Sequence, residues 1–222
     1  MQLIIKPAKD KANYLYLTLE ANEYRELWKR HARKLRASIR TITSLDFRQR
    51  TITAQVRMGT YGAAGWYHKA MALPTDPGNH GLKLMTLVHE LSHRLMTGNG
   101  FTMADFGIED RIGKDTDAIV DFQHRLIYLF EYDVMCNAHG DEGGELCRTY
   151  DELGQESNGA NAEPYKRAWQ WAMQLTFEQR QHCLRWLVQH IETGTLGTYL
   201  PGKPTAGDWI EQLEAIANTS TP

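Results

Sequence analysis

Two histidines and a glutamate stand at a spacing that suits metal chemistry. His89, Glu90 and His93 lie in the segment 87–94, which reads LVHELSHR. Side chains four residues apart project from the same side of a helix, so both imidazoles can reach one metal ion at about 2.0–2.1 Å. Zinc held by neutral ligands lowers the pKa of its bound water to about 7, and an adjacent carboxylate can accept that water's proton. The pattern therefore predicts hydrolysis by metal-activated water, with Glu90 as the general base.

The sequence around this pattern predicts that it lies on a helix. Apolar residues recur at helical spacing and would turn the two histidines toward a different side; they are Leu84, Leu87, Val88, Leu91 and Leu95. Turn or capping residues precede the segment at 74–79, and Gly98-Asn99-Gly100 follows it as a stop. Two ordinary histidines on an amphipathic helix are the alternative, which the period and the end signals together disfavour.

A zinc site needs at least three protein ligands, and this segment supplies two. A second, strongly apolar helix is expected over residues 117–138, where His124 and Glu131 share one inward stripe with apolar neighbours. They are separated by about 10.5 Å along the helix axis, so only one of them is expected to bind the ion. We favour His124 as the third ligand. The alternatives are Glu131 first, and then Asp121, Asp133 and Glu109.

The role left to Glu131 follows from the cost of burying charge. A buried carboxylate without a partner is unfavourable, so Glu131 must contact either a metal or a cation such as Arg125 or Arg94. For a lone buried histidine such as His124, the ordinary alternative is a satisfied core residue.

The remaining elements are expected to position this site. Residues 14–19 are rich in strand formers, 20–40 predict a helix, and 51–58 and 65–73 predict strands separated by a turn at 59–62. After the two helices that carry the candidate ligands, a loop is expected over residues 140–163. Helices are expected over residues 165–175 and 176–191. Residues 1–193 would form one domain, followed by a linker at 194–207, a short helix from 208 and a polar tail.

This order of elements resembles the zincin metallopeptidases over residues 20–140. The resemblance implies an α+β fold that is mostly helical, with a small sheet before the active-site helix. It also implies that an edge strand pairs with extended substrate, which would place residues 63–68 near the cleft; a hairpin with a glycine-rich turn is the alternative there. The metzincin pattern is excluded, because Met96 and Asn99 stand where it requires glycine and histidine.

Two further resemblances bear on the third ligand. A metal-binding Glu131 would make the chain resemble the gluzincins, whereas a histidine would complete a three-imidazole site. The chain is also similar to uncharacterised bacterial and phage His-Glu-x-x-His proteins, through residues 62–67, 124–126, 132–133 and 168–172. That similarity implies that His124 matters more than Glu131.

Three tyrosines are candidates to donate a hydrogen bond to the tetrahedral intermediate opposite the metal. They are Tyr67, Tyr128 and Tyr132, and for each the alternative is an ordinary core or surface aromatic residue.

The composition of the chain limits the size of its core, its expected location and its expected partners. With 222 residues and 42% hydrophobic residues, the chain can bury a sizeable core. Its three cysteines do not suggest a disulfide framework, and neither an export signal nor a membrane span is evident, so a cytoplasmic location is expected. The formal net charge of −2 gives no global attraction to nucleic acid. A basic run at 28–36 is interpreted as a solvated helix face balanced by Glu20, Glu23 and Glu26.

These observations favour a zinc-dependent peptidase with Zn²⁺ as cofactor and a peptide or protein as substrate. Two alternatives belong to other classes. One is a DNA-associated protease resembling the SprT-like group, recruited through the basic run. The other is a non-catalytic protein in which zinc only joins two helices.

Overall fold

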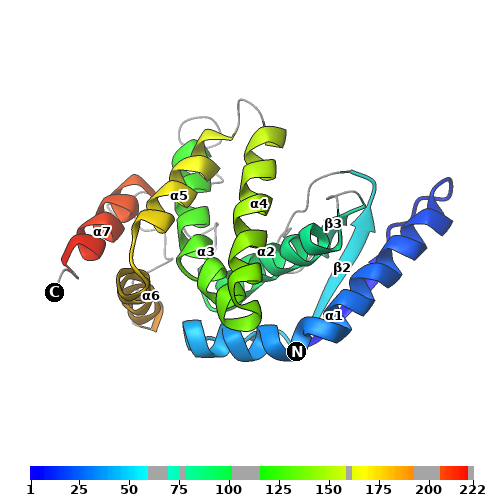
Figure 1. The fold of residues 1–222 in the computed structure, drawn as a ribbon, viewed down its shortest axis with the longest axis horizontal. Coiled ribbons are helices and arrows are strands. Elements are labelled where there is room, and N and C mark those ends of the chain that lie inside the picture. Colours follow the sequence, from blue (N-terminus) through cyan, green and yellow to red (C-terminus); the bar gives the residue numbers. More distant parts are fainter. Residues whose placement is uncertain (60–69, 76–78, 102–115, 159–161, 193–205, 220–222) are drawn as a thin grey trace.

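The computed structural model describes residues 1–59, 70–75, 79–101, 116–158, 162–192 and 206–219. One small sheet accompanies a mostly helical chain (Figure 1), as expected for an α+β protein of this composition. The strands are β1 (Gln2–Pro7), β2 (Thr51–Arg57) and β3 (Met71–Pro74). The helices are α1 (Tyr14–Thr43), α2 (His80–Gly98), α3 (Thr116–His139), α4 (Asp141–Asn158), α5 (Glu163–Gln174), α6 (Phe177–Glu192) and α7 (Ala206–Thr219).

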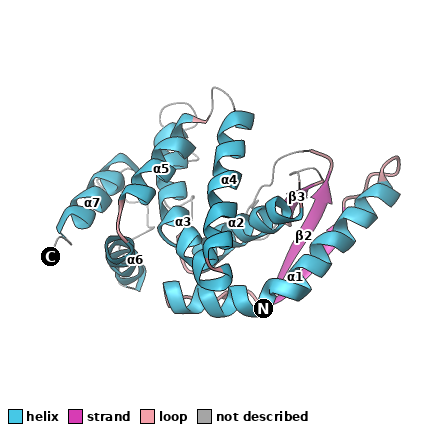
Figure 2. Cartoon of the chain, in the orientation of Figure 1, coloured by secondary structure: helices cyan, strands magenta, loops and turns pink. Residues whose placement is uncertain are grey.

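The sheet is parallel, with β2 between β1 and β3. Ile52, Ala54 and Val56 alternate along β2 as its buried positions and pack against α1 and α2 in one apolar cluster. Figure 2 shows the strands gathered beside α1 at one side of the molecule. Because β3 runs parallel to β2, the hairpin alternative is wrong for these two strands. Residues 63–68, expected near the cleft, lie outside the described part of the chain.

The strand expected at residues 14–19 is wrong, because α1 already begins at Tyr14. The Asp10 carboxylate accepts hydrogen bonds from the backbone N–H groups of Ala12 and Asn13, which shapes the turn before the helix. Leu17 then begins an apolar stripe that continues through Ala21 and supplies α1 with its buried face. Tertiary packing thus overrides the local strand preference. The actual first strand, β1, had not been anticipated.

Helix α3 is central, since it packs against α1, α2, α4, α5, α6 and α7. Its apolar character on most sides follows from this position. The last helix belongs to the same core: Trp209 and Leu213 are buried with side chains of α3 and α6, and Glu214 accepts a hydrogen bond from Arg125 at 2.7 Å. The expected linker falls almost wholly outside the described residues, whereas the expected short helix extends to 14 residues.

The loop expected at 140–163 is wrong over most of its length, because Asp141–Asn158 forms α4. Its glycines suggested a loop but instead permit close helix packing. A Cβ atom on Gly143 would lie 2.2 Å from the Met135 carbonyl oxygen, and one on Gly144 would lie 2.9 Å from Cys136 Sγ. Gly140, with φ +66°, makes the turn that folds α4 back along α3.

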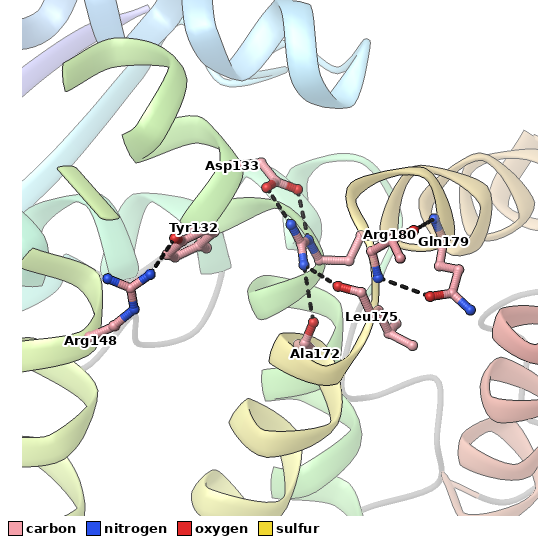
Figure 3. Close-up of polar contacts among 8 residues, drawn as sticks. Tyr132, Asp133, Arg148, Ala172, Leu175, Gln179 and Arg180 are labelled. Atoms are coloured by element: carbon pink, nitrogen blue, oxygen red, sulfur yellow. Dashed lines mark hydrogen bonds and ion pairs between the residues drawn. The ribbon is translucent and has the colours of Figure 1, made fainter. Parts of the chain in front are cut away.

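A buried ion pair ties α3 to α5 and α6. The Arg180 guanidinium donates to both oxygens of Asp133, at 2.9 and 2.7 Å, and to the carbonyl oxygens of Ala172 and Leu175 (Figure 3). We call these four residues the Arg180 node.

Among the described helices, none is both long enough and apolar enough to cross a membrane.

Candidate metal centre

Helix α2 presents the metal-binding pattern from the core of the protein. Asn79 caps its N-terminus by accepting a hydrogen bond from the Leu82 N–H at 3.0 Å. Its apolar side packs against the sheet and α1 through Leu87 and Leu91, which turns His89 and His93 toward α3 instead. The amphipathic pattern therefore does position the histidines on one side, as expected from their spacing.

Three imidazoles meet between α2 and α3. One ligand nitrogen from each of His89, His93 and His124 lies within 4.8 Å of the other two. Their ring centroids are 4.9 Å apart for His89 and His93, 5.2 Å for His93 and His124, and 5.5 Å for His89 and His124. Three neutral nitrogen ligands that leave a coordination position open form the kind of donor set that catalytic zinc uses.

Atoms of α3 lie within hydrogen-bonding distance of the Nδ1 atoms of His89 and His124. His89 Nδ1 lies 3.3 Å from Glu131 Oε2, and His124 Nδ1 lies 2.8 Å from the Val120 carbonyl oxygen. With Nδ1 protonated and donating, the Nε2 atom of each ring carries the free lone pair that a metal requires. Glu131, the alternative third ligand, thus contacts a histidine of the cluster rather than joining the cluster itself.

The surroundings keep two of the imidazoles neutral. Burial, together with the neighbouring His89, lowers the pKa of His124 to about 3 and also lowers the pKa of His93 well below its ordinary value. For His89, burial again lowers the pKa, but the carboxylates of Glu131, Glu90 and Asp151 together more than offset this, so that the net shift of the pKa is upward. Neutral imidazole is the form that binds metal, so His93 and His124 are ready to bind at neutral pH.

Glu90 lies beside the cluster as a buried acid, with 4% of its surface exposed. Burial raises the pKa of its carboxyl group to about 7, a value suited to taking up and releasing a proton near neutral pH. Its Oε2 atom and Glu131 Oε1 are buried without a hydrogen-bond partner among the described residues. Because uncompensated buried carboxylate oxygens are costly, these two atoms fit a centre that also holds a cation.

The other candidate ligands lie elsewhere or outside the described residues. Asp121 forms ion pairs with Arg125 and Arg167, at 2.7 and 3.0 Å, and Asp133 belongs to the Arg180 node. Glu109 falls outside the described part of the chain. Neither aspartate is therefore brought to the histidine cluster.

Of the three expected tyrosines, Tyr128 lies beside the cluster, and two further tyrosines lie there that were not expected. Tyr128 lies near His89 and His124 but donates its hydroxyl to Asp151 at 3.2 Å, and Tyr132 accepts a hydrogen bond from Arg148 at 2.7 Å. Tyr67 lies outside the described residues. Sequence reasoning missed two rings that do lie close: Tyr150 of α4, 5.6 Å from His89, and Tyr165 of α5, 4.3 Å from His124.

The position of Tyr150 beside the cluster could have been predicted from the apolar spacing around it. It follows Leu146 and Cys147 at helical spacing, and all three belong to one apolar cluster with α2. Tyr165 stands at the start of α5 and carried no comparable periodic signal.

No family model matches this chain, and neither the curated proteins nor the solved structures contain a significant match to it. The geometry of the histidine cluster and its neighbours is therefore what bears on the function of the protein.

Proposed function

We propose that the protein is a zinc-dependent hydrolase of peptide bonds with a zincin-like active centre. The convergence of His89, His93 and His124, with Glu90 beside them, is the observation that carries the proposal. These three residues would hold the ion, and Glu131 would orient His89 through its Nδ1 atom. When bound, zinc supplies a Lewis acid that acidifies water and polarises a carbonyl group.

Glu90 performs the proton transfers in this proposal. Its carboxylate takes a proton from the attacking water and returns it to the nitrogen of the leaving amine, so one group acts as base and then as acid. The raised pKa of Glu90, about 7, supports this role because such a group exchanges protons readily near neutral pH. Extended peptide is the substrate class that the zincin resemblance implies.

A non-catalytic zinc site is the second candidate function. It is favoured by one observation: the cluster joins α2 to α3, and both His89 and His124 are buried. An ion at this position would link two helices whether or not it met substrate. The two candidates differ in what they require of Glu90, since a purely structural site needs no base.

The experiment compares Glu90→Gln with wild type for zinc content and for cleavage of a mixed peptide library. A peptidase should retain its zinc but lose about 10²–10⁴-fold in rate, because the isosteric amide cannot accept the proton. Glu178→Gln, an exposed glutamate on α6, is the matched control and should behave like wild type. Zinc-loaded wild type that cleaves no peptide would overturn the peptidase proposal and leave the structural one.

A further inference from the structure

The second half of α1 carries a continuous group of exposed cations. Arg30, Arg33, Lys34 and Arg36 are all exposed, and none of them forms an ion pair with any residue in the described ranges. We call these four side chains the α1 basic face. The part of α1 that carries them is drawn in lighter blue in Figure 1 and follows the lower edge of that view.

The acids expected to balance this face are engaged elsewhere. Lys83 of α2 is buried and donates to Glu20 at 2.7 Å and to Glu23 at 2.5 Å. Through these two ion pairs, the carboxylates of Glu20 and Glu23 join α1 to α2. Of the three expected acids, only Glu26 contacts a cation of the basic run, Lys29, at 3.8 Å and in solvent. The four side chains are exposed, as the interpretation of a solvated helix face predicts, but Glu20 and Glu23 pair with Lys83 and not with these cations.

The four cations fall within the solvent-facing half of the helix, away from the buried Leu35 and Ile39. Positions 30, 33, 34 and 36 include pairs three and four residues apart, which are neighbours on a helix surface. The face spans about 9 Å along the axis, since each residue rises about 1.5 Å. Positive charge concentrated in this way, on a chain whose net charge is −2, gives a local attraction for a polyanion.

We propose that the α1 basic face binds the phosphate backbone of double-stranded nucleic acid. The guanidinium groups of the three arginines suit phosphate, because their planar arrays of N–H donors can bind two oxygens at once. Lys34 adds a point charge. Contacts to phosphate alone carry no sequence information, so the binding is independent of sequence. This inference does not depend on the proposed peptidase activity.

The test measures binding of a fluorescent DNA duplex of about 20 base pairs, two helical turns, as a function of salt concentration. Four phosphate contacts give a slope of about −3.6 in log K against log salt, or about 150-fold weaker binding at 200 mM than at 50 mM. The combined variant Arg30→Gln, Arg33→Gln, Lys34→Gln and Arg36→Gln should lose most of this slope. Glutamine keeps the helix propensity, and thermal unfolding checks that the fold is unchanged.

Two controls separate the α1 basic face from general charge. Replacing Lys6, Lys9, Lys11 and Arg185 by glutamine removes the same charge from other exposed positions and should leave the slope near that of wild type. The variant Arg30→Lys, Arg33→Lys and Arg36→Lys keeps the charge and should retain most of the binding. The proposal is overturned if the α1 variant binds DNA like wild type, or if wild type binds phosphatidylserine vesicles but no duplex.

Discussion

Two buried acids stand two residues apart on α3 and differ in how their charge is balanced. Asp133 has both oxygens engaged by Arg180, which also donates to two backbone carbonyls. Glu131 has one oxygen 3.3 Å from His89 and the other without a hydrogen-bond partner among the described residues. The Arg180 node is thus satisfied by protein atoms alone, whereas the histidine cluster is not.

This difference distinguishes an ion pair that protein atoms complete from a cluster that a bound cation would complete. A buried ion pair with complete hydrogen bonding fixes the arrangement of α3, α5 and α6 without further help. The histidine cluster concentrates three imidazole nitrogens and two incompletely satisfied carboxylates in one buried place, an arrangement that a divalent cation would stabilise. The node should therefore govern stability in every state of the protein, and the cluster only when metal is available.

The largest effect is expected at the node. Asp133→Asn leaves the Arg180 charge buried without its counterion and should lower the free energy of unfolding by about 3–5 kcal/mol. The same substitution in the exposed Arg40–Asp46 pair, Asp46→Asn, should cost only about 0–1 kcal/mol. Urea unfolding measures both. If zinc content falls with Asp133→Asn under conditions where the variant is folded, the two regions are not independent.

Metal removal should produce the next largest effect, and only at the cluster. With free zinc at about 100 to 1,000 times the dissociation constant, binding adds about 2.7–4.1 kcal/mol to wild-type stability. A chelator removes that increment. His124→Ala should unfold identically with and without chelator, whereas Asp46→Asn should keep the full difference. Equal stability of the wild type in zinc and in chelator would contradict a metal site here.

A smaller effect is expected for the contact between Glu131 and His89. Glu131→Gln keeps the size of the side chain but removes its charge, so zinc affinity should fall about 10–100-fold, as for other groups that orient metal-binding histidines. Competition with a chromophoric chelator measures this affinity. Glu145→Gln, which alters an exposed glutamate on α4, is the matched control. An unchanged zinc affinity in Glu131→Gln would show that Glu131 has no role in metal binding.

Much of the site could be predicted from spacing on two helices. The apolar periodicity around His89 and His93 predicted α2, and the stripe through His124 and Glu131 predicted that both face inward. Their separation along α3 suggested that only one could approach the ion. The structure adds that His89 contacts both residues: its Nδ1 lies 3.3 Å from Glu131 Oε2, and its ring centroid lies 5.5 Å from that of His124. That placement depends on helix packing, which one sequence does not display.

The incorrect predictions of secondary structure have a common physical origin. The local preference of Gly143 and Gly144 favours a loop, but these residues are small because α4 approaches α3 closely. Tyr14 and Leu15 were interpreted as strand residues, but Leu17 and Ala21 bury a helix against the sheet. In each case, a packing contact between two different elements overrides a local preference. The partners of Glu20 and Glu23 were misjudged for the same reason, because Lys83 lies on another helix.

The zinc content of protein purified without added metal decides whether His89, His93 and His124 form a metal centre. Wild type, His124→Ala and Glu131→Ala would be compared by elemental analysis, each after a folding check by circular dichroism. We expect about one zinc per chain in wild type, almost none in His124→Ala, and weakened but recoverable binding in Glu131→Ala. Wild type that holds no zinc and takes up none when zinc is supplied would contradict a metal centre at the three histidines.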